Sequence, residues 1–503
     1  MHVLQSDYVL TLVVIAVRTF WVPDSALLLM GFSISKVSYM SLAPASGTDR
    51  PGPRPKVQPS PSPARRAVPA VLTLVVALLL SLTAGPSYAA ASGRSEFLLV
   101  ADPAGQTVTT FRTSDLHRTG ELDGVAVGGH VGTLQLPDGR LIAVDDAHAR
   151  VLALRVTRQG RPQVVQSVPI PSTRTWERAA WGAADASLRY FAFTSDFSDS
   201  SSQLVTVVDL KTFHLSQLEL PLTATSTGGY AEAQVYLAGR PLQVVVTTGG
   251  AFTAYPLRDV LRGRHPAPSS SAPLGANNHG PVVSPDGKAV FSTTADGFDG
   301  ASLTGSTLTR PRSVAYSPTR DVVQNYRPKL AADGRTVWGA VAEDTGLAPQ
   351  DWADTRNDVN IIDTATFRSS LVRLPDGLTS QLALSARYGA VSTTSPDGDA
   401  LTLLDTDRRS ATYRRVVGTV ALPSATGGPV AGQPSAGTQG HTVAIAPRGN
   451  RVFVSNGGDG EISVVDSSRR RLVATISTPT GLVGGGYLTV VQPGATRTDL
   501  IAR

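Results

Sequence analysis

Short runs of aliphatic and β-branched residues, bounded by glycine, proline, asparagine or aspartate, recur along most of this chain. Apolar and polar positions alternate within the runs, which is typical of antiparallel strands joined by tight turns. One phrase, two aliphatic residues followed by aspartate, occurs as Val207-Val208-Asp209, Ile361-Ile362-Asp363, Leu403-Leu404-Asp405 and Val464-Val465-Asp466. Its return at intervals of tens of residues indicates a stack of similar units. We expect each aspartate to end a third strand and to cap the next turn with its carboxylate.

The clearest unit runs from Gly440 to Ile476. Its pattern predicts four strands, at Thr442–Ala446, Arg451–Ser455, Glu461–Val465 and Leu472–Ile476. Four strands in a meander of about 40 residues form one blade of a propeller. The residues Val452–Asn456, the Asp459-Gly460 turn and Ile462–Asp466 resemble the YVTN family of β-propeller repeats.

Other first strands are expected to begin at similar spacing, near His130, Arg178, Tyr230, His279, Tyr326, Ser380 and, in the unit above, His441. A lone strand at Gly485–Val491 and two early strands, Phe97–Ala101 and Val108–Phe111, would combine into a further blade that closes the ring. The sequence therefore predicts an all-β fold: a single propeller of seven or eight four-stranded antiparallel blades, closed by N- and C-terminal strands.

The N-terminal region has the features of a secretory leader. Arg65-Arg66 precede an apolar run at 67–84, and Ser87-Tyr88-Ala89 provide a small-x-small cleavage site. We expect an over-extended start or a leader at 1–39, a signal peptide with a Pro/Ser-rich n-region at 40–89, and the propeller at 90–503. The alternative is that 67–84 anchors the chain in a membrane, although this run is at the short end of spanning length.

Removal of the leader changes the charge of the protein. The whole chain has 45 Lys and Arg against 39 Asp and Glu. Residues 1–89 contain seven basic and three acidic groups, so the remainder has 38 and 36. This near-neutral balance argues against a nucleic-acid partner. Because the chain has no cysteine, disulfides and thiolate metal sites are excluded. We expect a secreted monomer, without membrane insertion once the signal is cleaved.

Three histidines, His130, His279 and His441, lie at or beside predicted entries of first strands. First strands line the central channel, so the three rings could converge at its mouth and bind zinc. The alternative is structural: a histidine at this position can hydrogen-bond the backbone of a neighbouring blade. No pair has the i, i+2 or i, i+4 spacing of a local metal site.

Acidic residues gather in the turns expected between second and third strands, on the same face as the entries. The turns at 145–148, 196–199, 296–299 and 459–460 fit ordinary turn chemistry, with calcium as the alternative. The longest such segment, 343–358, is a candidate partner-binding loop; the alternative is a solvated flap with its tryptophan folded back on the blade. Its candidate residues are Glu343, Asp344, Asp351, Trp352, Asp354 and Asp358.

Catalytic motifs such as Gly-x-Ser-x-Gly and HExxH are absent from the sequence. We therefore expect a secreted, non-catalytic propeller that binds an extracellular protein, polysaccharide or small ligand. Thr248-Gly249-Gly250, Arg258–Leu261 and Asn278-His279-Gly280 are similar to the layout of periplasmic zinc metallochaperone propellers. That resemblance implies zinc delivery to a transporter binding protein, although the chain lacks the paired histidines and histidine-rich segments of those proteins. A third alternative is a propeller enzyme, lactonase-like or dehydrogenase-like, which only the fold supports.

Overall fold

The computed structural model divides the chain into two units, Met1–Ser87 and Tyr88–Arg503. It describes residues 17–18, 31–32, 95–128, 131–172, 174–197, 202–221, 233–248, 250–276, 278–295, 297–316, 323–343, 349–425, 441–493 and 500–501. In the first unit, β1 (Val17–Arg18) pairs with β2 (Gly31–Phe32). None of the described helices is long and apolar enough to cross a bilayer.

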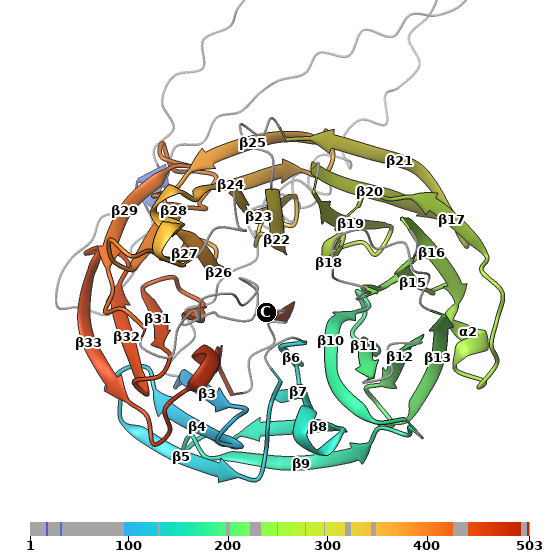
Figure 1. Cartoon of the computed structure of the whole chain (residues 1–503), viewed down its shortest axis with the longest axis horizontal. Coiled ribbons are helices and arrows are strands. Elements are labelled where there is room, and N and C mark those ends of the chain that lie inside the picture. Colours follow the sequence, from blue (N-terminus) through green and yellow to red (C-terminus); the bar gives the residue numbers. More distant parts are fainter. Residues whose placement is uncertain are drawn as a thin grey trace, which may run out of the picture. The chain divides into compact units, whose positions relative to one another are not determined.

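The second unit is a ring of eight antiparallel blades, named A to H in chain order (Figure 1). Blade A consists of β34 (Tyr487–Val491), β3 (Phe97–Asp102), β4 (Thr107–Arg112) and β5 (Arg118–Asp123), and blade B of β6 (Thr133–Gln135), β7 (Arg140–Asp145), β8 (Arg150–Val156) and β9 (Pro162–Pro169). Blade C consists of β10 (Trp176–Ala184), β11 (Tyr190–Phe197), β12 (Ser202–Asp209) and β13 (Leu215–Pro221), and blade D of β14 (Val235–Ala238), β15 (Gln243–Thr248), β16 (Ala251–Pro256) and β17 (Ser270–Pro273).

Blade E consists of β18 (His279–Val283), β19 (Ala289–Thr294), β20 (Gly297–Thr304) and β21 (Thr307–Ala315), and blade F of β22 (Val323–Leu330), β23 (Thr336–Glu343), β24 (Arg356–Asp363) and β25 (Arg368–Arg373). Blade G consists of β26 (Leu378–Leu384), β27 (Tyr388–Thr394), β28 (Ala400–Asp405) and β29 (Val416–Ala421), and blade H of β30 (Val443–Ile445), β31 (Arg451–Asn456), β32 (Glu461–Asp466) and β33 (Arg471–Ser477). Helix α2 (Leu257–Val260) lies between β16 and β17, and β35 (Leu500–Ile501) adds to β6.

Blade A closes the ring as predicted, because its first strand, β34, comes from the C-terminal region and pairs with β3. The structure resolves the choice between seven and eight blades in favour of eight. The predicted unit at Gly440–Ile476 is blade H, with strand ends shifted by at most one residue. Tyr230 lies outside the described residues, and the strand expected there begins at Val235.

The core lies between blades rather than inside any one of them. Each of the eight blade interfaces has its own cluster of buried apolar side chains. Phe453 of blade H, for example, packs with Leu98 and Phe111 of blade A. Since one face of a blade cannot be buried without its neighbour, closing the ring completes the core.

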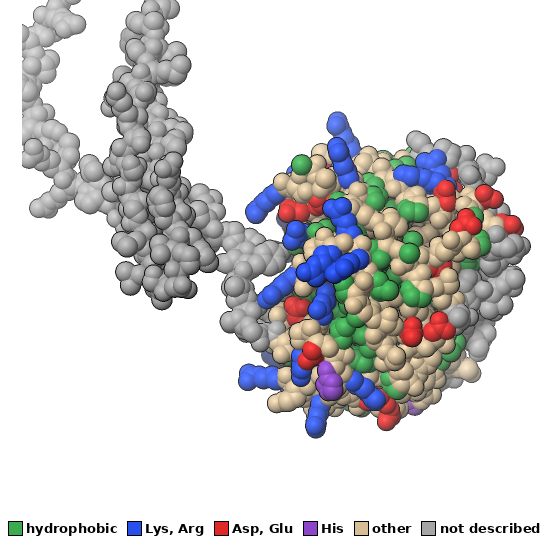
Figure 2. Space-filling model, turned by 90° about the vertical axis from the view of Figure 1, so that its left-hand side faces the viewer, with side chains coloured by type: hydrophobic (Ala, Val, Ile, Leu, Met, Phe, Trp, Pro, Cys, Tyr) green, Lys and Arg blue, Asp and Glu red, His purple; other side chains and the backbone are tan. Residues whose placement is uncertain are grey.

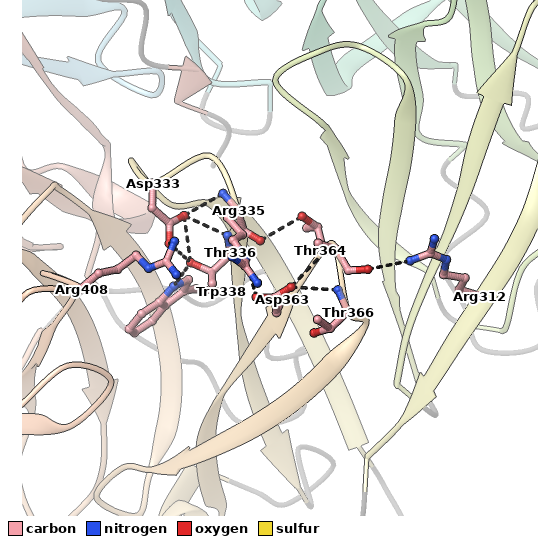
Figure 3. Close-up of polar contacts among 10 residues, drawn as sticks. Arg312, Asp333, Arg335, Thr336, Trp338, Asp363, Thr364, Thr366 and Arg408 are labelled. Carbon is pink, nitrogen blue, oxygen red and sulfur yellow. Dashed lines mark hydrogen bonds and ion pairs between the residues drawn. The ribbon is translucent and has the colours of Figure 1, made fainter. Parts of the chain in front are cut away.

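The repeated aspartates cap the turns after the third strands, as predicted. Asp363 accepts hydrogen bonds from the backbone N–H groups of Ala365 (3.1 Å) and Thr366 (2.9 Å), as Figure 3 shows. Equivalent backbone bonds reach Asp209, Asp405 and Asp466. Burial acts to raise the pKa of Asp363, but the bonds from Thr366 and Arg335 together outweigh it and lower the pKa.

Arginines on the same side of the ring connect neighbouring blades (Figure 3). Arg312 of β21 donates to the carbonyl oxygen of Ala365 in blade F (3.1 Å). Arg408, between β28 and β29, lies 3.9 Å from the carboxylate of Asp333 in blade F. These turns therefore stabilise the ring.

Candidate functional site

The strand order places the connections of each blade on two opposite faces. The turns between second and third strands and the connections into each first strand form one face, which we call the entry face. The turns between first and second and between third and fourth strands form the other, the basal face. The predicted site residues that the structure describes belong to the entry face or to the strand ends that border it.

The described connections of the entry face are acidic. They carry one arginine, Arg174, against seven aspartates: Asp146, Asp351, Asp354, Asp376, Asp397, Asp399 and Asp459. A surface with this balance raises the local concentration of cations and of positively charged ligands. The near-neutral total charge of the propeller therefore conceals a charged entry face.

A cavity of about 560 Å³ opens between blades D and E. It is lined by Pro273, Leu274, Gly275, Thr294, Gly297, Asp299, Pro311, Ser313, Val314 and Ala315. Most of this lining is apolar, and Thr294 and Ser313 add hydroxyl groups. A mostly apolar cavity with a few polar groups is the usual form of a small-molecule site.

Asp299 is the one ionisable residue in that lining, and it is only 8% exposed. The backbone N–H of Gly275 donates to its Oδ2 (2.6 Å), which fixes the carboxylate toward blade D. Within the described part of the chain, Oδ1 receives no hydrogen bond. A buried carboxylate needs hydrogen-bond donors, so Oδ1 is positioned to accept one from a ligand.

Close backbone approaches shape this cavity. A Cβ atom on Gly297 would overlap the carbonyl oxygen of Val314, so the start of β20 requires glycine at this position. Beside the cavity, burial raises the pKa of Tyr316, and the negative charge of Asp299 acts in the same direction.

The three predicted histidines have different surroundings. His130 lies outside the described residues. His279 begins β18, and its ring meets the ring of Trp181 edge-on at 4.4 Å. The described residues contain no group of three histidine, aspartate or glutamate side chains that could hold a metal ion. Zinc binding at these histidines stays a prediction.

His441 is completely buried between blades G and H. Its Nδ1 lies 2.6 Å from the carbonyl oxygen of Ser455, and its Nε2 lies 2.8 Å from Oδ2 of Asp399. Asp399 also accepts the backbone N–H groups of Ser395 and Ala425. Both ring nitrogens are therefore engaged within the protein: the backbone partner Ser455 belongs to blade H itself, and the partner from the neighbouring blade is the side chain of Asp399.

The segment 343–358 is a shorter loop than the sequence suggests. Glu343 ends β23, Asp358 lies within β24, and both are buried. Between the strands, a 3-10 helix at Pro349–Asp354 places Trp352 at 3% exposure. Of the two alternatives for this tryptophan, the structure has the ring folded back on the blade. Asp351 and Asp354 lie in the same helix, and Asp344 lies outside the described residues.

The turn at 145–148 uses its acidic groups to hold blades together. Asp145 is fully buried and accepts hydrogen bonds from Arg150 (2.7 Å) and from the backbone of Ala126 (3.2 Å). Asp146 accepts the backbone N–H of Ala179 in blade C (2.8 Å). These aspartates therefore connect segments that are distant in sequence instead of capping their own turn.

Sequence reasoning assigned Asp299 to the turn at 296–299, whereas it lies within β20, and it did not single out Asp399. A signal for Asp299 does exist, because it stands between Gly297 and Gly300 within one strand. Glycine inside a strand often marks a close approach of another backbone or of a ligand. Nothing near Asp399 in sequence reveals its partner, since His441 is 42 residues away.

Known structures resemble this propeller in fold. AztD from Citrobacter koseri has 12% sequence identity and a TM-score of 0.54; the match covers 79% of this chain and 98% of that one. The apo form of the same protein matches with a TM-score of 0.53 and covers 80% and 100%. Dihydro-heme d1 dehydrogenase NirN in complex with DHE has 15% identity and a TM-score of 0.51, covering 79% and 75%.

No protein-family model matches the chain, and no curated protein does. At these identities the structural matches show the fold alone. The chain is thus an eight-bladed β-propeller with an acidic entry face.

Proposed function

We propose that this chain is a secreted, non-catalytic propeller that binds a small ligand through its entry face. The supporting observation is the cavity between blades D and E, which has Asp299 in its lining and no described residue donating to Oδ1 of that carboxylate. A ligand that combines an apolar body with an amine or a hydroxyl group matches this lining. The acidic entry face favours the amine, because it attracts positive charge.

Asp299→Asn tests this proposal with two compounds of similar size, cyclohexylamine and cyclohexanol. We expect the wild-type protein to prefer the amine, and the variant to lose that preference. A hydrogen bond to a charged group contributes about 1.5–3 kcal/mol, so the affinity for the amine should fall by about tenfold to a hundredfold. Ligand-observed NMR titration measures both affinities.

Asp397→Asn provides the control, because Asp397 is an exposed acid on the same face and does not line the cavity. It should leave the amine affinity within about twofold of wild type, since exposed charges act weakly at a distance. Equal losses in the two variants would contradict a specific site. The proposed secretion has its own test: the released protein should begin at Ala90 on N-terminal sequencing.

The alternative is a zinc-binding, metallochaperone-like propeller that delivers metal to a transporter binding protein. Among the described histidines, His279 supports it best, since it stands at the entry of a first strand on the acidic side of the ring. Zinc titration of chelator-treated protein should then find about one tightly held ion, and His279→Ala should abolish binding. Tight zinc binding that survives this change would exclude His279 as a ligand.

A further inference from the structure

The basal face is more strongly basic than the entry face is acidic. Its described connections carry seven aspartates against eighteen lysines and arginines. The aspartates are Asp115, Asp138, Asp185, Asp259, Asp286, Asp333 and Asp407. The basic residues are Arg158, Arg161, Arg189, Lys211, Arg240, Arg258, Arg262, Arg264, Lys288, Arg335, Arg387, Arg408, Arg409, Arg414, Arg415, Arg448, Arg469 and Arg470.

The exposed arginines concentrate on two adjacent blades, G and H. Figure 2 views the ring from the side of β29 and β33, and it shows Lys and Arg side chains gathered toward one face. We call this group the basic patch; its exposed members are Arg387, Arg408, Arg409, Arg415, Arg448, Arg469, Arg470 and Arg471.

Few acids neutralise the basic patch. Arg408 approaches Asp333 at 3.9 Å and Arg469 approaches Asp466 at 3.5 Å, and in both of these long pairs the arginine is exposed. Within the described part of the chain, five members form no ion pair: Arg387, Arg409, Arg415, Arg470 and Arg471. Most of the charge of the patch is therefore directed at solvent.

Exposed apolar side chains adjoin the arginines. Val416 follows Arg415 at the start of β29 and is 38% exposed. Leu472 and Val473 follow Arg471 in the neighbouring strand β33 and are 38% and 42% exposed. Basic residues beside exposed aliphatic residues are the composition of surfaces that rest on a bilayer, where charge attracts the headgroups and apolar groups enter the interface.

The chain also enters the propeller on the basal face. The backbone N–H of Thr113, in the basal turn of blade A, donates to the carbonyl oxygen of Glu96 (3.0 Å). Arg451 of blade H donates to the carbonyl oxygens of Thr113 and Ser114. The first described residues of the propeller therefore lie on the face that carries the basic patch.

We infer that the basic patch docks the propeller on an anionic phospholipid bilayer. Guanidinium groups would pair with lipid phosphates, and Val416, Leu472 and Val473 would lie at headgroup depth. The entry face would then point away from the membrane. This inference uses the proposed location outside the cytoplasm but not the proposed ligand.

The absence of cysteine allows a direct test in the full chain. Val473→Cys places an environment-sensitive nitrobenzoxadiazole probe beside the basic patch. Val483→Cys places the same probe at a 65% exposed position in the connection that leads to β34, on the entry face. With vesicles containing about one-third phosphatidylglycerol, we expect emission from position 473 to rise and shift to the blue, while position 483 stays unchanged. Because the comparison is within bound protein, insertion of 67–84 alone would not produce this difference.

Charge variants identify the source of the attraction. Replacing Arg469, Arg470 and Arg471 by glutamine should lower the apparent affinity for the vesicles, measured by the probe at position 473, by about a hundredfold. This follows from about 1 kcal/mol per arginine and roughly tenfold in affinity per 1.4 kcal/mol. The matched control replaces Arg258, Arg262 and Arg264, which are exposed basal residues of blade D, with the same change in net charge. It should lose less than about threefold, because these residues lie outside the patch.

Three results would overturn the inference. One is an equal response of the probes at positions 473 and 483. Another is the same response with vesicles of phosphatidylcholine alone or at about 1 M salt, where surface charges are screened. The third is a rise and blue shift of the emission from position 473 with soluble polyphosphate but not with vesicles. This result would assign the patch to a free polyanion instead of a membrane.

Discussion

The buried pair formed by His441 and Asp399 provides the sharpest prediction about stability. His441 is 0% exposed, and the side chain of Asp399 is 2% exposed. A carbonyl oxygen can only accept, so the ring must donate from Nδ1 to Ser455. On its other side, Nε2 and the carboxylate share a second hydrogen bond. His441→Ala removes both bonds and leaves the carboxylate buried with one donor fewer.

Breaking a buried pair by removing one partner costs about 3–5 kcal/mol. The entropy of unfolding is about 2.1 cal/mol/K per residue, so it amounts to about 0.8 kcal/mol/K for a propeller of roughly 400 residues. A loss of 4 kcal/mol should therefore lower Tm by about 5 °C. Calorimetry and urea unfolding would measure the loss, and His214→Ala is the control because His214 is exposed in a basal turn. The control should change stability by less than about 0.5 kcal/mol.

A double-mutant cycle with Asp399→Asn separates the pair from general damage to the fold. If the two side chains interact directly, the double variant should lose at least about 1.5 kcal/mol less than the sum of the single losses. Additive effects, or a loss below about 1 kcal/mol for His441→Ala, would refute the structural role. If His441 instead bound zinc, a chelator would lower the Tm of the wild type and leave that of the variant unchanged.

Other expected outcomes follow from the turns and from ring closure. The pKa values of Asp209, Asp363 and Asp466 are lowered in the folded state. On acidification the unfolded chain takes up protons first, so the stability that these carboxylates contribute is present above about pH 4 and is lost below it. Urea midpoints between pH 6 and 3 should therefore fall less steeply when all three aspartates are replaced by asparagine. Gly297→Ala should cost about 1–3 kcal/mol, measured as a lower Tm, because its methyl group meets the Val314 carbonyl; an unchanged Tm would refute the close approach. Tyr487→Phe removes the acceptor of the buried Thr133 N–H (3.1 Å) and should lower the urea midpoint by an amount equal to about 1–3 kcal/mol; no change would mean that this link between blades A and B contributes nothing.

The sequence predicts the frame well because the frame depends on local signals. Alternation, turn residues and the recurring aspartate identify the clearest units, and the strand at Gly485–Val491 needs a partner that the N-terminal strands can supply. The site depends on residues distant in sequence. Asp299 meets Gly275 across blades, and His441 meets Asp399 across blades. Blade packing decides which polar residues become buried, and the spacing of residues along one blade does not contain that information.

Trp352 illustrates the same limit. An aromatic ring among acidic residues in a long connection can belong to a partner-binding surface or can fold back on its own blade. The same sequence pattern fits both arrangements. The outcome depends on whether a neighbouring hydrophobic surface is close enough to cover the ring. Here the ring is 3% exposed, so packing within the protein takes precedence.

The opposite charges of the two faces permit two independent tasks. A strand of six residues spans about 20 Å, and charges in about 0.15 M salt are largely screened beyond about 8 Å. Replacing Arg469, Arg470 and Arg471 should therefore leave the affinity of the entry-face cavity for cyclohexylamine unchanged, while Asp299→Asn should leave the response of the probe at position 473 to vesicles unchanged. A loss of both activities in either variant would mean that the two faces are coupled through the ring itself. Separate losses would mean that a propeller of almost zero net charge holds one face to a membrane and presents the other to a cationic ligand.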